Sequence, residues 1–255
     1  MASSRHERPL FVLYGASMTE YAFKPGGWGA SLAHLYCRKA DILLRGYRGW
    51  NTRRALAAMR DILPQESQCQ PALVVVFFGA NDAAFPMPSG KGQYVPLEEF
   101  RKNLQDIASY LLGLSKTTRV ILVTAPPVNE QARREDARIR HGKDAARFTD
   151  RTNERARKYA QACIEAAKAV NVGVVDLWTA IQKEENWQTE CLSDGLHLTA
   201  KGNQILFDEL VKVIEDANWT PSLSWKSMAE DYIEPSIYDF VHPSFEYSDD
   251  SYLQL

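Results

Sequence analysis

The sequence predicts an α/β protein in which one parallel β-sheet is covered by helices on both faces. Apolar runs alternate with segments of helical periodicity along the chain, an order typical of βα units. The apolar runs are nearly continuous, as expected of strands that are buried on both faces. A length of 255 residues suits one full α/β domain. Because crossover connections are right-handed, a doubly wound sheet in the order 2-1-3-4-5 is the simplest topology.

Five apolar runs, rich in strand-forming residues and bounded by turn residues, are the expected strands: Leu10–Tyr14, Asp41–Leu44, Leu73–Phe78, Arg119–Thr124 and Val172–Leu177. Between and after them lie the expected helices: Gly29–Arg38, Thr52–Leu63, Pro96–Leu114, Phe148–Val170 and Ala200–Ala217. In a doubly wound sheet, ligands bind outside the carboxyl ends of the strands, at the point where the strand order reverses. The loops that follow the first three strands should therefore carry the chemistry.

The composition of the chain changes near its C-terminal end. Residues 1–219 are expected to form the α/β domain. From Thr220 onward the sequence is rich in proline, serine, acidic and aromatic residues and has no helical pattern. We expect this tail, residues 220–255, to pack through its aromatic side chains on the domain or on a neighbouring subunit, with its last residues disordered. The sequence therefore leaves open whether the chain forms a homo-oligomer.

The net charge and the cysteine content indicate which partners the protein binds and in which cellular compartment it resides. The formal net charge of −2 gives no global attraction to nucleic acid or to anionic membranes. No stretch has the length of a membrane span, and the N-terminus lacks the apolar core of a signal peptide. Four scattered cysteines without a CxxC pair argue against zinc and predict reduced thiols. We therefore expect a cytoplasmic protein that binds neither nucleic acid nor metal.

The segment from Asn129 to Arg157 is dense in arginine, lysine, glutamate and aspartate. A basic face for nucleic acid is one interpretation of this composition. Because acidic residues are interleaved throughout the segment, a solvated helix and loop is the favoured interpretation. Its position after the fourth expected strand leaves open a third role, as a lid beside the active site.

Two polar segments far apart in the chain supply a candidate catalytic triad. Ser17 follows the first strand, where Gly15 and Ala16 allow a sharp turn and a close approach of substrate. Asp194 and His197 lie in the segment LSDGLHLTAKG, so a tight turn can place the carboxylate against one imidazole nitrogen. The other nitrogen is then free to accept the proton of Ser17.

Two further loop residues can donate hydrogen bonds to an oxyanion. Gly49 offers an unobstructed backbone N–H and Asn81 a side-chain amide, both from loops that flank the first strand. With the N–H of Ser17 they make three donors. Each of the candidate residues, taken alone, is more often a turn residue or a helix cap. The functional interpretation depends on all of them falling on the loops that the fold marks as the site.

In this order, the polar segments resemble the blocks of the SGNH/GDSL hydrolase superfamily: serine in the first, glycine in the second, asparagine in the GxND of the third, and DxxH in the last. The motifs GGWGA, RKADILLRGYRGWNTR, FFGAND and APPVNE are similar to the isoamyl acetate-hydrolysing esterase-like branch, and WTPSLSWKSM resembles its plant-type GDSL esterases. The resemblance implies an SGNH hydrolase fold, a flavodoxin-like three-layer α/β/α sandwich with a five-stranded parallel sheet. It also implies hydrolysis of carboxylic esters without a metal or organic cofactor. Carried over by motif, Ser17, Asp194 and His197 form the triad, and Ser17, Gly49 and Asn81 form the oxyanion hole.

The resemblance implies a serine esterase that hydrolyses a small-molecule ester of a short acyl group, acetyl above all, through an acyl-enzyme on Ser17. Two alternatives stay open. An acyltransferase would use the same acyl-enzyme with an alcohol as acceptor. A weakly active or inactive binding protein is the other, because Ala16 stands where the GDS block carries an aspartate. That aspartate is not the triad acid, so its absence is expected to loosen the loop more than it impairs proton transfer.

Overall fold

The fold is built on one parallel β-sheet. The computed structural model of the protein describes residues 8–90, 92–144 and 150–231. The strands of this part are β1 (Leu10–Gly15), β2 (Asp41–Gly46), β3 (Leu73–Phe77), β4 (Arg119–Val123) and β5 (Gly173–Val175). All neighbouring strands are parallel, and their order is β2-β1-β3-β4-β5, which confirms the predicted 2-1-3-4-5 topology.

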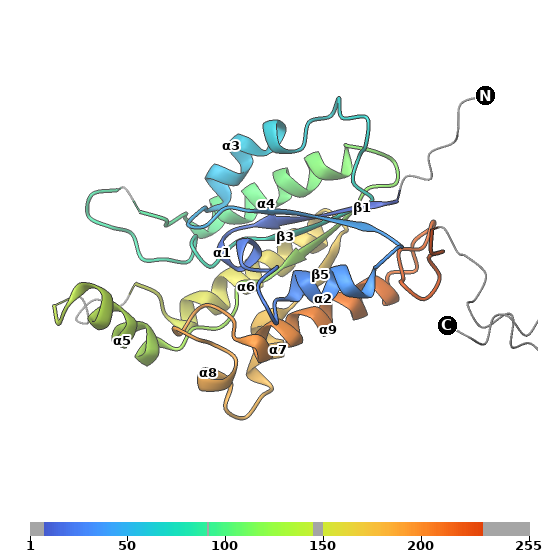
Figure 1. Cartoon of the computed structure of the whole chain (residues 1–255). Helices are drawn as coiled ribbons and strands as arrows, with labels where there is room; N and C mark the ends of the chain where they lie inside the picture. Colours follow the sequence, from blue (N-terminus) through green and yellow to red (C-terminus); the bar gives the residue numbers. More distant parts are fainter. Residues whose placement is uncertain (1–7, 91, 145–149, 232–255) are drawn as a thin grey trace, which may run out of the picture.

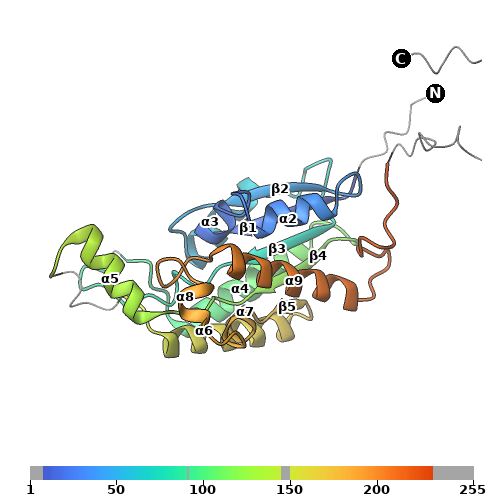
Figure 2. The same cartoon turned by 60° about the horizontal axis from the view of Figure 1, so that its bottom comes forward.

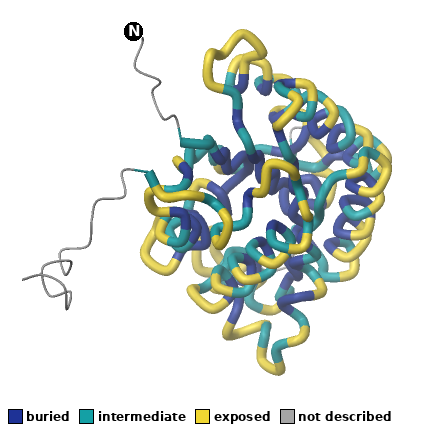
Figure 3. The backbone as a smooth tube through the Cα atoms, turned by 90° about the vertical axis from the view of Figure 1, so that its right-hand side faces the viewer, coloured by how far each residue is buried: buried dark blue, intermediate teal, exposed yellow. Residues whose placement is uncertain are grey.

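Helices cover both faces of the sheet, and each face carries its own core. Because alternate residues of a strand point to opposite faces, Phe11 and Leu13 of β1 lie in one core while Val12 and Tyr14 lie in the other. The first core packs against α2 (Trp28–Leu35), α7 (Leu177–Gln182) and α9 (Ala200–Asp216), and the second against α3 (Thr52–Ile62), α4 (Leu97–Leu112) and α6 (Asn153–Ala169). This arrangement confirms the predicted three-layer α/β/α sandwich (Figure 1, Figure 2). Figure 3 shows the buried residues gathered inside it and the exposed residues on the outer loops.

Two predicted boundaries in the second half of the chain are wrong because side chains cap the helices there. β5 ends at Val175, earlier than predicted, since the side chain of Asp176 accepts an amide hydrogen bond from the first turn of α7. α6 begins at Asn153, later than the predicted Phe148, since Thr152 caps its first turn in the same way. Residues 145–149, where the predicted helix starts, lie outside the described residues.

Three described helices have no counterpart in the sequence prediction. Besides α7 they are α1 (Ser17–Glu20) and α8 (Trp187–Glu190), and all three are too short to show an apolar periodicity. α5 (Glu130–His141) lies in the segment that is predicted to be a solvated helix and loop, and it contains no buried residue, as that interpretation predicts.

Residues 220–231 run along the N-terminal end of the sheet and contact the domain. The Tyr36 hydroxyl donates to the carbonyl of Leu223 at 2.8 Å, and the ammonium of Lys39 donates to the carbonyl of Trp225 at 2.8 Å. Arg8 forms an ion pair with Asp231 at 2.6 Å. The division at residue 219 stays a prediction. Residues 232–255, with most of the aromatic side chains on which the packing prediction depended, lie outside the described residues.

None of the helices in residues 8–90, 92–144 and 150–231 is both long and apolar enough to cross a membrane. In the same residues, no cluster of histidine, cysteine, aspartate and glutamate is arranged to hold a metal ion. The four cysteines, Cys37, Cys69, Cys163 and Cys191, are free thiols.

Candidate active site

The end of β1 places Ser17 at the carboxyl edge of the sheet. β1 ends at Gly15, and Ser17 begins α1 after a single connecting residue. The turn requires glycine at position 15, because a Cβ there would lie 2.1 Å from the hydroxyl of Thr19 and 2.6 Å from the carbonyl of Phe77. The neighbours of β1 are β2 and β3, so the loops after all three strands converge on Ser17, as predicted.

A tight turn before α9 holds Asp194 against His197. Oδ1 of Asp194 accepts hydrogen bonds from the backbone N–H of Leu196 at 3.0 Å and of His197 at 2.8 Å. Gly195 has φ +80°, and a Cβ there would lie 2.4 Å from the carbonyl of Asn129, so this turn needs glycine for both reasons. The other carboxylate oxygen, Oδ2, is left to face the imidazole.

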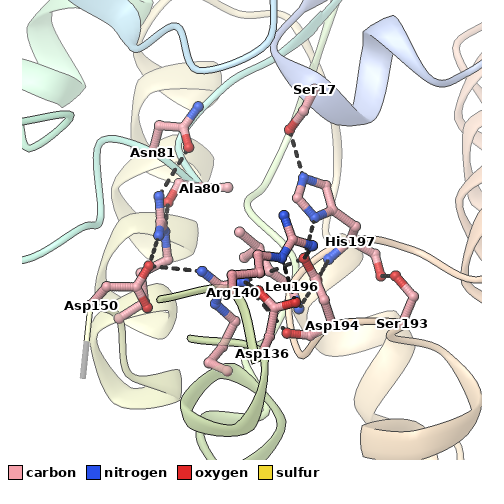
Figure 4. A network of polar contacts seen from close by, with 12 residues as sticks. Ser17, Ala80, Asn81, Asp136, Arg140, Asp150, Ser193, Asp194, Leu196 and His197 are labelled. Atoms are coloured by element: carbon pink, nitrogen blue, oxygen red, sulfur yellow. Dashed lines mark hydrogen bonds and ion pairs between the residues drawn. The ribbon is translucent and has the colours of Figure 1, made fainter. Parts of the chain in front are cut away.

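Ser17, His197 and Asp194 form a continuous chain of hydrogen bonds (Figure 4). Oγ of Ser17 lies 2.9 Å from Nε2 of His197, and Nδ1 of His197 lies 2.8 Å from Oδ2 of Asp194. Burial opposes ionisation of Asp194, but hydrogen bonds from His197 and the charge of Arg133 hold the pKa of Asp194 well below its usual range. An ionised carboxylate only accepts, so Nδ1 carries the hydrogen and Nε2 accepts from the Ser17 hydroxyl.

The predicted oxyanion donors surround the same cavity as Ser17. Gly49 has φ +82°, a left-handed backbone conformation that favours glycine, and both Gly49 and Asn81 line the cavity. Asn81 donates from Nδ2 to the carbonyl of Trp50 at 2.8 Å. Ser17 is the first residue of α1, so its N–H has no acceptor within the helix. The structure therefore brings together all five predicted site residues; their catalytic roles remain a proposal.

Asp82, next to Asn81, braces the third loop and does not line the cavity. It is fully buried, and its Oδ1 accepts from the N–H of Thr52 at 2.9 Å and from the Thr52 hydroxyl at 2.5 Å. Oδ2 has no partner among the described residues. Burial raises the pKa of Asp82 to about 6, although the hydrogen bonds from Thr52 oppose this shift.

The cavity beside Ser17 has a volume of about 950 Å³ and a mainly polar lining. The side chains that the sequence interpretation did not assign to the site include Tyr21, Lys24, Arg48, Arg133, Arg140 and Arg151. Among the residues that the structure describes, the apolar part of the lining is limited to Pro25, Leu196, Leu198 and Ala200. A long alkyl chain would therefore find little apolar surface in this cavity.

The favoured interpretation of residues 129–157 as a solvated segment is wrong at two arginines. Arg133 donates to Oδ2 of Asp194 at 3.3 Å, and Arg151 is 5% exposed and contacts Asn81. α5 itself stands at the side of the molecule where β1 leads into α1 (Figure 1). The only signal for a buried role was the position of the segment after β4, since its composition does not separate these two arginines from their exposed neighbours.

Comparison with known proteins finds extensive similarity to one family. A family model of the GDSL-like lipases/acylhydrolases matches residues 13–205. A GDSL esterase/lipase of Oryza sativa subsp. japonica is 46% identical over 237 residues, which cover 93% of this chain and 89% of the relative. An isoamyl acetate-hydrolyzing esterase 1 homolog of Homo sapiens is 39% identical over 227 residues, covering 87% of this chain and 89% of that protein.

Solved structures share the fold at lower sequence identity. The crystal structure of a lipase/acylhydrolase from Enterococcus faecalis superposes with a TM-score of 0.62 at 23% identity. The match covers 82% of this chain and 96% of that one. The chain therefore shares its overall fold with that lipase/acylhydrolase.

Proposed function

The chain belongs to the GDSL-like lipase/acylhydrolase family and is a carboxylic ester hydrolase, and from this premise we propose that it works through an acyl-enzyme on Ser17. The observation that carries the proposal is the hydrogen-bonded chain from Ser17 through His197 to Asp194, with distances of 2.9 and 2.8 Å. This is the arrangement in which an imidazole can accept the hydroxyl proton while a carboxylate stabilises the imidazolium that forms.

The proposed reaction has two halves that use His197 in turn as base and acid. Oγ of Ser17 attacks the ester carbonyl carbon while Nε2 of His197 takes the hydroxyl proton. The imidazolium then gives this proton to the leaving alcohol, and the acyl group remains on Ser17. His197 next takes a proton from water while the water oxygen attacks the acyl carbon. The bond between this carbon and Oγ of Ser17 then breaks, the imidazolium returns its proton to Oγ, and the acid is released. In both halves the N–H groups of Ser17 and Gly49 and the amide of Asn81 stabilise the oxyanion.

We propose esters of short acyl groups, acetyl above all, as substrates. The polar lining of the cavity supports this assignment, because a long acyl chain gains its binding energy from apolar surface. The human relative bears a name that specifies isoamyl acetate hydrolysis, which is also hydrolysis of an acetyl ester. A series of p-nitrophenyl esters from acetate to dodecanoate tests the assignment: kcat/KM should fall as the acyl chain lengthens. A rise toward the long esters would overturn it.

We also propose that the protein is located in the cytoplasm. It is supported by the four free cysteines, two of them exposed, which suit a reducing compartment. Imaging the full chain fused at its C-terminus to a fluorescent protein tests this location. A signal confined to an organelle or to the secretory route would contradict it.

The proposed nucleophile is tested by Ser17→Ala and by a fluorophosphonate probe. The probe should label the native chain on Ser17, as read from a peptide map, and Ser17→Ala should lose labelling and turnover of p-nitrophenyl acetate. Ser31→Ala is the matched control, because the Ser31 hydroxyl bonds back to the carbonyl of Gly27 in α2 and does not line the cavity. Full turnover by a folded Ser17→Ala chain would overturn the proposal, and a native chain inert to probe and esters would favour the binding-protein alternative.

A further inference from the structure

A buried arginine lies behind the loop that carries Asn81. The side chain of Arg151 is almost inaccessible, and a buried guanidinium is stable only where its donors find acceptors. Its Nε donates to the carbonyl of Ala80 at 2.8 Å, and Nη2 donates to Oδ1 of Asn81 at 3.0 Å and to Oε1 of Gln93 at 2.6 Å. Nη1 pairs with Asp150. Arg151 therefore joins four polar groups around the loop that follows β3.

The chemistry of these contacts determines which way the Asn81 amide faces. A guanidinium only donates, so the oxygen of the amide must point toward Arg151 and the NH₂ group away from it. One hydrogen of the NH₂ group is used by the carbonyl of Trp50, at an N–O distance of 2.8 Å. With both ends of the amide held, rotation about its last side-chain bond is blocked. The second hydrogen of Nδ2 has no acceptor among the described residues, and Asn81 lines the cavity, so this hydrogen is available to an oxyanion there.

From these contacts we propose that Arg151 is a positioning residue that holds the Asn81 amide in the orientation in which it stabilises the oxyanion. The inference rests on the proposed function, because it requires Asn81 to be an oxyanion donor. Arg151 acts through Asn81 and not through its charge. A donor of this kind is effective only when it is fixed before the charge develops, since reorganisation during the reaction would cost the energy it supplies.

The same contacts continue to the triad. Oδ2 of Asp150 accepts from Arg133 at 2.9 Å as well as from Arg151, and Arg133 donates to Oδ2 of Asp194 at 3.3 Å. Burial raises the pKa of Asp150, but the charges of Arg151 and Arg133 outweigh it and hold that pKa below its usual value. Asp150 thus remains an anion between two cations. Arg133, Asp150 and Arg151 all lie between β4 and α6. Through them, the loop that carries Asn81 is connected to Asp194.

The proposal is tested by a double-mutant cycle on kcat for p-nitrophenyl acetate, with Arg151→Met, Asn81→Ala and the double variant. Asn81→Ala should lower kcat by about 10²–10³-fold, as expected for loss of one oxyanion donor. Arg151→Met should lower kcat by about 10–10²-fold with KM changed by less than about threefold, because a misplaced donor is weakened but not removed. The double variant should match Asn81→Ala within about threefold, since Arg151 has nothing left to orient. If the two losses multiply in the double variant, Arg151 acts independently of Asn81 and the proposal is overturned.

Two further variants keep the test decisive. Arg155→Met is the matched control, because Arg155 donates from Nε to the carbonyl of Ala83 at 2.8 Å in the same loop but does not contact Asn81. Its kcat should stay within about threefold of the native value. Arg151→Lys keeps the charge in the site but cannot reach all the acceptors that the planar guanidinium spans, so it should retain most of the defect. Native kcat in Arg151→Lys would show that the set of contacts which only the planar guanidinium can span is not needed to hold the Asn81 amide, and would overturn the proposal even if Arg151→Met does not fold.

The experiments distinguish failure of the positioning role of Arg151 from failure of the proposed acyl-enzyme mechanism. Labelling of Ser17 by the fluorophosphonate tests the acyl-enzyme and does not depend on Arg151. If Ser17 is labelled but Asn81→Ala keeps native kcat, the acyl-enzyme mechanism stands and the positioning role of Arg151 is overturned. If Ser17 is neither labelled nor required for turnover, the proposed function itself fails.

Discussion

The two halves of the candidate active site are held in place in different ways. In the triad half, Asp194 and His197 are three residues apart, and one turn with hydrogen bonds inside it aligns them. In the oxyanion half, Asn81 is oriented by Trp50, which is 31 residues away, and by Arg151, which is 70 residues away. A motif whose residues form hydrogen bonds with one another over a few positions can be recognised in a sequence. A side chain oriented by distant residues needs the folded chain before its environment is known.

This difference has an energetic consequence. The turn at Asp194 is held mainly by hydrogen bonds among its own residues, with Arg133 of α5 as a distant partner, so most substitutions elsewhere should leave its geometry intact. The oxyanion loop depends on buried polar groups from several segments, and each of these is costly to leave unpaired. Three substitutions test the comparison, and the largest effect is expected in the triad half.

Asp194→Asn should lower kcat for p-nitrophenyl acetate by about 10⁴-fold with little change in the unfolding temperature. An amide in this place can donate to Nδ1 of His197, which then puts the ring hydrogen on Nε2 and blocks proton transfer from Ser17. Steady-state kinetics with purified protein measures the loss. Asp136→Asn is the control, because Asp136 lines the same cavity and pairs with Arg133 but does not contact His197. A similar loss in both variants would mean that the general charge of the cavity matters, and not the hydrogen bond to His197.

The sequence was sufficient for the part of the site whose geometry is local. Alternation of strands and helices and the handedness of the crossovers predict the strand order, and with it the meeting of the loops after β1, β2 and β3 at one edge of the sheet. The sequence could not identify Arg151 as buried, because residues 129–157 hold many arginines and their composition is that of a solvated helix. It does indicate a solvated helix in this segment, and α5 buries no residue, but without an apolar periodicity the bounds of that helix cannot be predicted. Burial of a polar side chain depends on partners distant in the chain.

Asp82→Asn tests the support of the oxyanion loop, and its effect should appear in stability rather than in rate. Burial raises the pKa of Asp82 from its ordinary 3.8 to about 6, so the folded chain binds more protons than the unfolded chain between these values. The free energy of unfolding should therefore fall, by about 3 kcal/mol from this group, as pH rises through that window. Asparagine keeps the oxygen that accepts from Thr52 but has no charge. Denaturant unfolding from pH 4 to pH 7 should show Asp82→Asn gaining about 3 kcal/mol relative to the native chain.

The control for this measurement is Asp106→Asn, which removes an exposed carboxylate paired with Lys102 on α4. Its stability relative to the native chain should not change over the same window, because an exposed pair contributes little. A stability difference between Asp82→Asn and the native chain that is constant with pH would mean that Asp82 ionises normally despite its burial. If kcat of Asp82→Asn falls by more than about tenfold at fixed pH, Asp82 takes part in the reaction itself. Its role would then no longer differ from that of Asn81, the proposed oxyanion donor.

The smallest effect is expected from Ala16→Asp, at the junction of β1 and α1. Ala16 occupies the N-cap position of α1 and makes no side-chain capping bond, and nearby Thr19 has a buried hydroxyl without a partner among the described residues. An aspartate could accept from N–H groups of the first turn and from this hydroxyl, a gain of about 1 kcal/mol. Because Ala16 is buried in an apolar cluster, desolvation of the new carboxylate offsets much of the gain. The unfolding free energy should therefore change by less than about 1 kcal/mol. We expect kcat to change by less than about tenfold in either direction, because a tenfold change in rate needs a change of about 1.4 kcal/mol in the activation free energy. Kinetics and denaturant unfolding of the two chains measure both quantities. If only Ala16→Asp hydrolyses esters and reacts with the fluorophosphonate, the hydrogen-bonded triad is not sufficient for catalysis, and the native chain is better described as a binding protein.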